Sequence, residues 1–412
     1  MAGTVFLPPK HFYRFTMHLH RLLLLLLPAF TFLESSCAQN SPPAAALSGM
    51  IVLRDGWERR VYLVKPAFYK QLISPYEGAL VDSTDVGSDG AFAFRDLSSI
   101  RENGIYLLFS KPAGSRFYNE IVDPPAENYA CLVLGPGIRT RLEGNAWELA
   151  RSYRLLEAGP ESHLMAQIRD CRAPLFRETP APPVAAPEEE YGLHDAPAAQ
   201  KAANAALDAF LDTTLAVLPT FAALRLRAPE NAFRERPEFF LRILARLRSQ
   251  APDDPWTNQL AVFLDPSQLP VLQGEKMPGF ALPTPDGDTL RLSDVQSKLL
   301  LVDFWASWCA PCRVEARATI RPLYDEYHAK GFNVLGVSID RGREAWVAAI
   351  RKDGAMWPNV SDLLGDASPV RQALKFEYIP SNYLLDAEGR LLARNLHREE
   401  LRIFVKNYIE RQ

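Results

Sequence analysis

The chain has 412 residues, of which 48% are hydrophobic, so it is long enough to form two or three packed domains. Its 46 basic and 49 acidic residues leave a net charge of -3 without a long run of Lys and Arg, which excludes the electrostatic signature of a nucleic-acid-binding protein. The five cysteines are too few for a disulfide-stabilised scaffold: Cys37, Cys131, Cys171, Cys309 and Cys312.

Residues 1–38 have the layout of a secretory signal peptide. Basic residues precede an uncharged stretch at 22–33 that contains six consecutive leucines, and small residues follow it. The stretch is too short to span a bilayer, so we expect cleavage after Ala38 and a periplasmic or otherwise extracytoplasmic protein, where disulfides persist. The alternative is a lipoprotein anchored through a lipid-modified Cys37, although Glu34 stands where a lipidation signal needs an apolar residue.

Residues 46–150 are predicted to form a β-rich domain. Two apolar runs flank an Asp-Gly pair in "MIVLRDGWERRVYLV", which predicts a hairpin, and Phe92 and Phe94 alternate with small residues in "VGSDGAFAFRDL". Further strands are expected in "GIYLLFS" and "CLVLGPG". Strands at this spacing are typical of a small β-sandwich. The segment has no cluster of His, Cys or carboxylates, so we expect a binding or spacing role.

Residues 151–270 are predicted to be a helical connector. The pattern is helical at 145–172, and the segment 173–200, rich in Pro, Ala and Glu, favours an exposed linker. Beyond it, apolar residues recur at helical spacing in "AALDAFLDTTLAVLPTFAALRLRA" and "RPEFFLRILARLRSQ". One stripe is expected to be core or docking surface: Phe239, Phe240, Ile243, Leu244 and Leu247.

Residues 271–412 alternate strand and helix, which predicts an α/β domain whose central sheet is covered on both faces. A hairpin is expected around Asp286-Gly287, and buried strands are expected in "KLLLVDFWAS" and "FNVLGVSID". Helices are expected in "PCRVEARATIRPLYDEYHAKG", "REAWVAAIRKDG" and "REELRIFVKNYIE". A strand, a turn and a second strand are expected in "YIPSNYLLDAEGRLLAR".

Cys309 and Cys312 are three residues apart at the start of a predicted helix. Unpaired backbone N–H groups and the positive end of the helix dipole favour a thiolate at Cys309, which makes it the attacking sulfur. Cys312, one turn further on the same face, then resolves the mixed disulfide. Pro311 suits the first turn because its missing N–H costs nothing there. The pair is therefore predicted to be a redox-active disulfide.

Two acidic residues frame the pair. Asp303 interrupts an otherwise apolar strand, where a lone carboxylate is unfavourable unless it has a partner or a function. Glu315 lies three residues after Cys312 on the same helix face. Either is a candidate general acid/base for the thiol of Cys312. The alternatives are an edge-facing or hydrogen-bonded structural acid for Asp303 and an ordinary residue on a solvated helix face for Glu315.

These residues carry a family resemblance. "VDFWASWCAPC" resembles the motif of the thioredoxin superfamily, and "GEKMPGFALPTPDGDTLRLSDV" resembles the entry to its TlpA/ResA-like branch of extracytoplasmic thiol-disulfide oxidoreductases, with an AhpC/TSA/redoxin-type domain. The match covers residues 274–408. It implies a thioredoxin-like fold, dithiol–disulfide exchange without a bound cofactor, and a cis-Pro380 that faces the cysteines and, with Ile379, binds the substrate chain.

The resemblance also bears on partners. It implies disulfide-containing protein substrates and a dithiol protein as electron partner, for which a membrane-embedded donor is our hypothesis. Ala310 and Pro311 offer no charged or imidazole group to over-stabilise the thiolate, which favours a reductase of protein disulfides. Trp308 is expected to contact the substrate and to shield the pair from solvent.

The sequence also departs from the family. Arg317 stands where the family's helix carries a kinking proline, so we expect a straighter helix. Asp303 is similar to thioredoxin itself and Glu315 to the ResA-like branch, which leaves the identity of the proton acceptor open. The β-rich domain at residues 46–150 is similar to N-terminal domains fused to such oxidoreductases in Gram-negative bacteria. This resemblance rests on "VDSTDVGSDGAFAF" and "LVLGPG", and it implies no known chemistry.

Other interpretations of the cysteines are open. A zinc site needs two more ligands, but no cysteine follows Cys312 and the histidines after residue 38 are not at ligand spacing, so we expect no metal. A peroxiredoxin-like peroxidase would use an isolated cysteine in a Pro/Thr context. A non-enzymatic binding module would use the pair as a structural disulfide. Cys131 and Cys171 are expected to be two separate thiols rather than a bridge.

Overall fold

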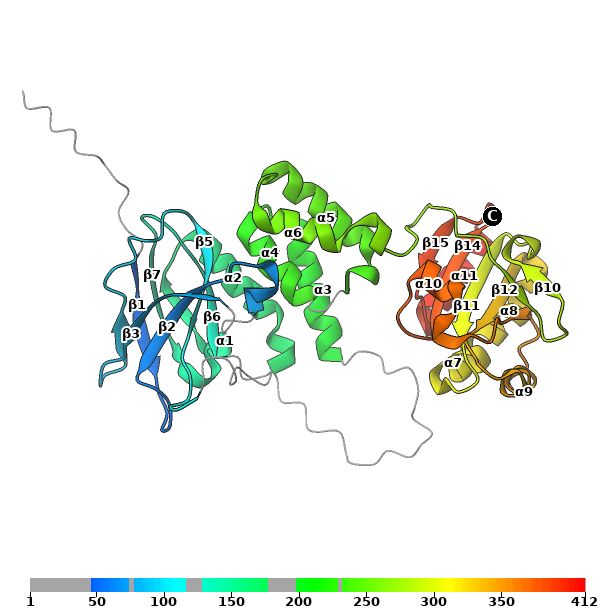
Figure 1. The fold of residues 1–412 in the computed structure, drawn as a ribbon, viewed down its shortest axis with the longest axis horizontal. Helices are drawn as coiled ribbons and strands as arrows, with labels where there is room; N and C mark the ends of the chain where they lie inside the picture. Colours follow the sequence, from blue (N-terminus) through cyan, green and yellow to red (C-terminus); the bar gives the residue numbers. More distant parts are fainter. Residues whose placement is uncertain (1–45, 74–77, 116–127, 177–197, 229–231, 412) are drawn as a thin grey trace, which may run out of the picture. The chain divides into compact units, whose positions relative to one another are not determined.

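The computed structural model describes residues 46–73, 78–115, 128–176, 198–228 and 232–411 (Figure 1). The predicted signal peptide, Cys37 and most of the predicted linker lie outside these residues. Within the described ranges, no helix is both long enough and apolar enough to cross a membrane.

The β-rich part contains two four-stranded sheets, with strand orders β4-β1-β7-β8 and β3-β2-β5-β6. β1 and β7 run parallel, whereas the other neighbours are antiparallel. β8 pairs with β7, so the first sheet continues beyond the expected domain limit at residue 150. The strands are β1 (Ala46–Val52), β2 (Arg60–Lys65), β3 (Ala79–Asp85), β4 (Ala91–Ala93), β5 (Gly104–Phe109), β6 (Tyr129–Leu134), β7 (Arg139–Asn145) and β8 (Arg154–Glu157).

Both sheets contribute to one hydrophobic core. Successive side chains of a strand point to opposite faces, so buried and exposed residues alternate where one face is exposed, whereas β5 is buried at every position. In β4, for example, Phe92 is buried while Ala91 and Ala93 are exposed, as the sequence pattern predicts. The strand residues buried in this core include Leu47, Ile51, Val61, Leu63, Tyr106, Leu108, Leu132 and Leu142.

The predicted hairpin around Gly56 is wrong. Gly56 has a φ of 83°, which fits an Asp-Gly turn, but the strands on its two sides, β1 and β2, belong to different sheets. A turn signal reports a local reversal of the chain. It does not choose the partner of a strand, because pairing depends on which face of the strand is buried.

The helical connector follows. The segment 145–172, predicted to be helical, contains two helices but also strand β8. The apolar stripe of the α5 helix is buried, as predicted. It packs in one core with apolar side chains of α3, α4 and α6. The helices are α1 (Leu149–Ser152), α2 (Pro160–Cys171), α3 (Ala198–Thr213), α4 (Val217–Arg227), α5 (Pro237–Gln250) and α6 (Pro255–Phe263).

The C-terminal part is built on a five-stranded sheet in the order β13-β12-β11-β14-β15 (Figure 1). The central strand β11 is parallel to β12 and antiparallel to β14, and all of its residues are buried. The predicted hairpin around Gly287 is confirmed. The strands are β9 (Ala281–Pro283), β10 (Thr289–Arg291), β11 (Leu299–Trp305), β12 (Phe332–Ser338), β13 (Asn359–Val360), β14 (Ser381–Asp386) and β15 (Leu391–Arg394).

Helices and loops cover both faces of this sheet, as predicted. Leu299 and Leu301 of β11 share a core with α8 and α11, whereas Leu300, Val302 and Phe304 share a second core with α10 and the β9–β10 hairpin. Alternate residues of one strand therefore face two different cores. The helices are α7 (Ala310–Glu315), α8 (Arg321–Tyr327), α9 (Arg343–Asp353), α10 (Pro369–Leu374) and α11 (Arg398–Glu410).

Arg317 led us to expect a straighter helix after the cysteines, and the structure shows a helical stretch that is not α-helical throughout. A π-helical segment, Ala316–Ile320, lies between α7 and α8, and Pro322 follows in the first turn of α8. π-helical segments and prolines are both recognised causes of irregular helices. Arg317 belongs to the π-helical segment itself.

Candidate active site

The two cysteines lie where β11 leads into α7, and they form a disulfide. Cys309 is the N-cap of α7, and its sulfur accepts a hydrogen bond from the backbone N–H of Cys312 over 3.3 Å. Pro311 lies in the first turn, as predicted. Only 5% of Cys309 and 2% of Cys312 is exposed, so the pair is embedded in the protein rather than displayed on a loop.

The loop before the cysteines is held by a buried carboxylate. Asp340, which follows β12, accepts hydrogen bonds from the backbone N–H of Ser307 over 2.9 Å and from its hydroxyl over 2.6 Å. Ser338 donates a further hydrogen bond to Asp340 over 2.7 Å. Charge-assisted bonds of this kind are among the stronger hydrogen bonds in proteins, so they fix the path by which the chain enters the cysteine pair.

A second buried carboxylate anchors α7 from the other side. Asp353, at the end of α9, forms an ion pair with Arg313, whose Nη2 lies 2.9 Å from Asp353 Oδ1. Arg313 also donates to the backbone carbonyl of Ser307 over 3.0 Å. Arg317 binds the same carboxylate over 2.6 Å. Together these bonds tie the first turn of α7 and the preceding loop to one point.

The cysteines belong to a small apolar cluster with Trp305, Ile339 and Trp346. Ile379 packs against this cluster, and the peptide bond between Ile379 and Pro380 is cis, as expected. The expectation that Trp308 shields the pair is not supported, because the side chain of Trp308 is 65% exposed and other residues bury the sulfurs. Trp308 is a surface residue next to Cys309.

Asp303 lies in the middle of β11, between Gly336 of β12 and Asn382 of β14. It is only 4% exposed. Burial raises the pKa of Asp303 well above its ordinary value, and the nearby charge of Glu315 adds to this shift. A carboxyl group with a raised pKa binds a proton more readily than an exposed one, which is the property that a proton acceptor for a thiol requires.

Glu315 is not on a solvated helix face, so that alternative is wrong. The residue is 2% exposed, and both of its carboxylate oxygens approach Nδ1 of His397, at 2.9 and 3.1 Å. The backbone N–H of Arg398 donates to the same carboxylate over 3.1 Å. The structure therefore brings the charge of Glu315 close enough to Asp303 to act on its pKa, and it adds a histidine that sequence reasoning did not select.

His397 was missed because its contact with Glu315 joins residues 82 positions apart. In the sequence, His397 stands at the predicted start of a helix, with no other histidine or cysteine nearby. The one available signal was a polar residue at a helix N-terminus, which is common and carries no chemistry by itself. The pairing depends on the tertiary fold.

Cys131 and Cys171 are free thiols in the structure, in line with our expectation of two separate cysteines. Burial raises the pKa of Cys131 to about 12. Because the thiolate is the reactive form, Cys131 is an inert thiol at neutral pH. Burial also raises the pKa of Cys171, and Cys309 and Cys312 are the disulfide-bonded cysteines in the described ranges.

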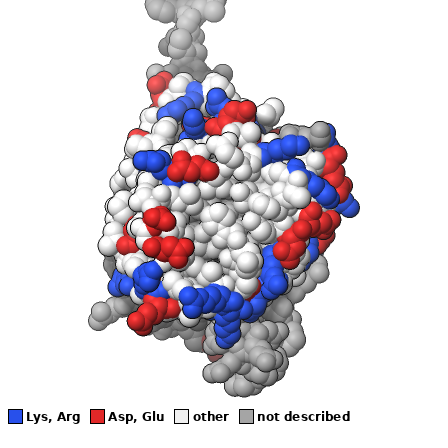
Figure 2. Space-filling model, turned by 90° about the vertical axis from the view of Figure 1, so that its right-hand side faces the viewer, with Lys and Arg blue, Asp and Glu red and all other residues white. Residues whose placement is uncertain are grey.

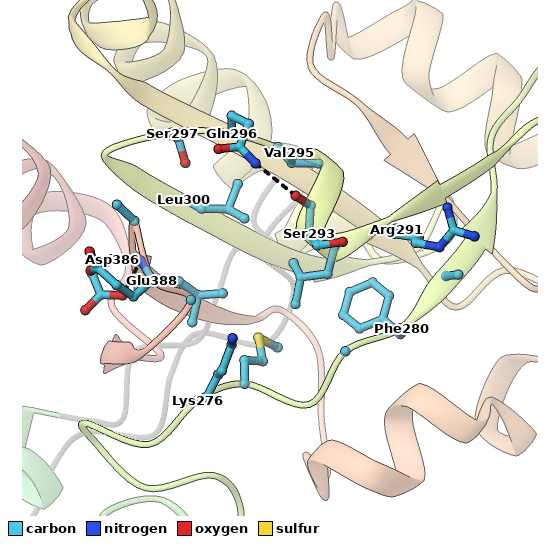
Figure 3. Close-up of a pocket in the computed structure, with 17 residues that line it drawn as sticks. Lys276, Phe280, Arg291, Ser293, Val295, Gln296, Ser297, Leu300, Asp386 and Glu388 are labelled. Atoms are coloured by element: carbon cyan, nitrogen blue, oxygen red, sulfur yellow. Dashed lines mark hydrogen bonds between the residues drawn. The ribbon is translucent and has the colours of Figure 1, made fainter.

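A cavity of about 880 Å³ in the C-terminal part lies away from the cysteines. It lies beside Leu300 and Asp386, at the end of the sheet where β11 begins, whereas the cysteines follow the end of β11. At ~3.3 Å per residue, the two sites are separated by roughly 17 Å of strand. Figure 3 shows Asp386 and Glu388 on one side of this cavity and Arg291 on the other.

The surface charge agrees with the balanced composition. Figure 2 shows one face on which a broad central area is uncharged, while basic and acidic side chains gather around its rim. Both signs are interspersed there. Such a face does not present the single-sign patch that attracts nucleic acid.

Comparisons with known proteins point to one family. The AhpC/TSA family matches residues 273–394. The thiol:disulfide interchange protein DsbE of Pseudomonas fluorescens biotype C is 31% identical over 133 residues, which are 31% of this chain and 69% of that protein. The thiol-disulfide oxidoreductase ResA of Oceanobacillus iheyensis is 30% identical over 106 residues, 26% of this chain and 53% of that protein.

A solved thiol-disulfide oxidoreductase from Bacteroides fragilis is 38% identical. The alignment covers 32% of this chain and 98% of that one, with a TM-score of 0.31. The family match lies entirely within the C-terminal part, which holds the disulfide, and the chain spans about half the length of ResA.

Proposed function

Because this chain belongs to the thiol-disulfide oxidoreductase family of the thioredoxin superfamily, we propose that Cys309 and Cys312 perform its dithiol–disulfide exchange and reduce the disulfides of proteins outside the cytoplasm. The observation that carries the proposal is the disulfide at the N-terminus of α7, packed against Ile379 and backed by two buried acids. No bound cofactor is required, since the two sulfurs hold the electron pair that is exchanged.

The exchange runs in two steps. The thiolate of reduced Cys309 attacks one sulfur of a substrate disulfide, which forms a mixed disulfide and releases the first substrate thiolate. Cys312 then loses its proton to a carboxylate, attacks the sulfur of Cys309 and releases the second substrate thiolate. The enzyme dithiol is oxidised to a disulfide, the substrate disulfide is reduced to two thiols, and the protons end on the substrate sulfurs by way of solvent and the enzyme acid.

We assign the proton acceptor to Asp303 and a supporting role to Glu315. Burial gives Asp303 a raised pKa, so it can take the proton of a thiol. Glu315 instead accepts a hydrogen bond from the backbone N–H of Arg398, and one of its carboxylate oxygens lies 2.9 Å from Nδ1 of His397. Its charge in turn favours the protonated form of Asp303. The two acids thus have different tasks.

The substrate chain is proposed to bind over Ile379, Pro380 and Trp308. Ile379 packs against the cysteine cluster, and Trp308 beside Cys309 is 65% exposed. Tyr378, next to Ile379, is 50% exposed. Exposed apolar side chains around a buried disulfide suit an unfolded protein segment that brings its own disulfide to the pair.

The proposed location of the protein and its electron supply rest on the predicted signal peptide at residues 1–38. The signal-like residues 1–38 support secretion, with lipidation at Cys37 as the alternative. A secreted reductase needs electrons from another dithiol protein, and we keep a membrane-embedded donor as the hypothesis. For the front half, the shared core of the two sheets supports a small sandwich with a binding or spacing role.

The test is redox cycling of the leaderless protein. We expect the purified chain to reduce insulin disulfides with dithiothreitol, and Cys309→Ser to abolish turnover without loss of folding. Cys312→Ser should trap mixed disulfides, and Cys171→Ser is the matched control because Cys171 is a free thiol. A potential below about -230 mV supports a reductase, whereas roughly -120 to -180 mV supports an oxidant or isomerase. Turnover by Cys309→Ser would refute the proposal, and a Cys309→Ser protein that unfolds would favour a structural disulfide.

A peroxidase is the second candidate, supported by the match to the AhpC/TSA family. Against it, the reactive cysteine is paired three residues from a second one rather than isolated. Consumption of hydrogen peroxide by the reduced protein, measured beside insulin reduction, separates the two activities. Peroxide consumption faster than disulfide reduction would replace our proposal with this one.

A further inference from the structure

His397 occupies the boundary between solvent and the buried acids. Its side chain is 22% exposed, whereas that of Glu315 is 1% exposed. Nδ1 of His397 lies 2.9 Å from one carboxylate oxygen of Glu315 and 3.1 Å from the other. Among the described residues, the side-chain hydrogen bonds found for His397 go to Glu315. The imidazole therefore links a group that cannot reach water to the surface.

The chain around His397 is held in an unusual conformation. Asn395 and Arg398 have φ values of 51° and 48°, in the left-handed region that residues with side chains seldom adopt. This backbone directs the N–H of Arg398 and the ring of His397 to the same carboxylate. Backbone conformations of this kind persist only where surrounding contacts enforce them, and they concentrate at functional sites.

The enforcing contacts come from the strand next to Asp303. Asn382 of β14, the register partner of Asp303, donates to the carbonyl of Leu396 over 2.7 Å and accepts from its N–H over 3.1 Å. The side chain of Asn395 accepts from the hydroxyl of Ser381 over 2.8 Å. Ser381 directly follows Pro380. The segment that carries His397 is thus fastened to the same strand that presents the substrate platform and borders Asp303.

We propose that His397 is a positioning residue that carries protons between the buried acids, Asp303 and Glu315, and solvent. This deepens the proposed function and rests on it. In each turnover, Cys312 gives a proton to the acids, which must lose it before the next turnover. In the tautomer whose Nδ1 carries no hydrogen, Nδ1 of His397 accepts the proton from Glu315, and the imidazolium releases its Nε2 proton to water. No electrons move in this step, and exchange of the ring protons with water restores the first tautomer before the next turnover.

A histidine suits this task because it exchanges protons between about pH 5 and 8. The charged groups near it lie on α7, β11 and the first turns of α11, where Glu399 and Glu400 follow Arg398. Glu315 faces it from α7, and Asp303 lies behind Glu315 on β11. Arg398 follows it in α11. Arg402, one turn later, binds the backbone carbonyl of Ala318 in the π-helical segment.

The test uses two substitutions in the full leaderless chain, with insulin reduction followed from pH 5 to 9. H397Q keeps a hydrogen-bond donor for Glu315 but cannot carry a proton, and H397A removes both. In wild type we expect kcat/KM to change with pH between about pH 5 and 8, where a histidine exchanges its proton. In H397Q we expect this change to be absent. In H397A we expect kcat/KM at pH 7 to fall about tenfold, less than the roughly 10²–10⁴ of a directly acting acid or base.

Free imidazole provides the decisive readout. Added imidazole should restore turnover of H397A and leave H397Q unchanged, because glutamine fills the site. H328A is the matched control, since His328 is exposed and its Nδ1 contacts the carbonyl of Phe332, at the far end of β12. A wild-type pH profile in H397Q, or a loss in H397A that imidazole does not restore, would overturn the inference.

A result that overturns the role of His397 can be distinguished from one that overturns the proposed function. If the wild-type chain reduces insulin and Cys309→Ser does not, the exchange stands, and an unaffected H397Q removes only the role of His397. If the wild-type chain does not reduce insulin at any pH, or if Cys309→Ser retains turnover, the proposed function itself fails.

Discussion

The substitution Asp303→Asn should make the oxidised protein more stable at high pH and slower as an enzyme. Burial raises the pKa of Asp303, and the charge of Glu315 adds to this, so the folded protein holds the proton more tightly than the unfolded chain does. Between the unfolded and the folded pKa, the folded state binds more protons. Stability is therefore fully present at low pH and falls as pH rises through this window.

The size of the effect follows from the linkage. Each unit by which the folded pKa exceeds the unfolded pKa lowers the free energy of unfolding by ~1.4 kcal/mol once the pH is above both. Asparagine has nearly the same shape and no charge, so it removes this pH-dependent loss. A buried amide without its full set of partners costs about 1–3 kcal/mol, but this term does not change with pH. The diagnostic quantity is therefore the change with pH in the difference between the unfolding free energies of Asp303→Asn and wild type.

The assay is calorimetry of the full chain in its oxidised form, at pH values from 4 to 9. With the disulfide closed, neither Cys309 nor Cys312 titrates. We identify the unfolding transition of the C-terminal part as the one whose Tm changes when the disulfide is reduced. We expect the difference between Asp303→Asn and wild type to move in favour of the variant as pH rises, by ~2–4 °C in Tm for each kcal/mol.

Asp325→Asn is the matched control, because Asp325 is an exposed carboxylate on α8 of the same domain. It should show no such trend. Reductase turnover should fall by roughly 10²–10⁴ in Asp303→Asn alone. A difference between Asp303→Asn and wild type that stays constant from pH 4 to 9 would refute the reasoning, because the buried carboxyl would then bear no charge-dependent penalty.

The remaining predictions use the same calorimetric transition. Glu315→Gln removes a charge that helps raise the pKa of Asp303, so the fall in stability with rising pH should end at a lower pH than in wild type. Arg313→Ala should lower stability by about 3 kcal/mol, because it leaves the buried carboxylate of Asp353 with one arginine fewer. Arg317→Ala should lower it by less than about 1 kcal/mol, since Arg317 is 45% exposed in its side chain. Equal losses in the two arginine variants would contradict this ranking.

The disulfide-bonded cysteine pair could be placed from sequence because its determinants are local. An apolar run, a CxxC motif and a helical pattern are contiguous, so they put Cys309 at a helix N-terminus whatever the rest of the chain does. The cis bond before Pro380 required the family resemblance in addition, because nothing around Pro380 in the sequence distinguishes it from an ordinary trans proline.

The misses share a physical cause. The environment of Glu315 depends on where α11 begins relative to α7, and the hairpin around Gly56 failed because β1 pairs with β4 and β7 instead of β2. Both errors concern which distant segments of the chain contact each other in the tertiary structure. Helical periodicity places Glu315 on the face of Cys312, but periodicity cannot say whether that face meets solvent or another element of the domain.

The cost of the acids is itself an argument for their function. β11 is buried along its whole length, so an apolar residue at 303 would remove a charge from the core of the sheet and add apolar burial. The chain instead keeps Asp303 there and places a second buried acid, Glu315, close enough to raise its pKa further. Burial and the nearby charge of Glu315 both destabilise the charged form of Asp303, which is unfavourable for folding but favours binding of a proton at Asp303. A protein that used its disulfide only as a structural link would gain nothing from this arrangement, whereas an enzyme that must take a proton from Cys312 in every turnover depends on it.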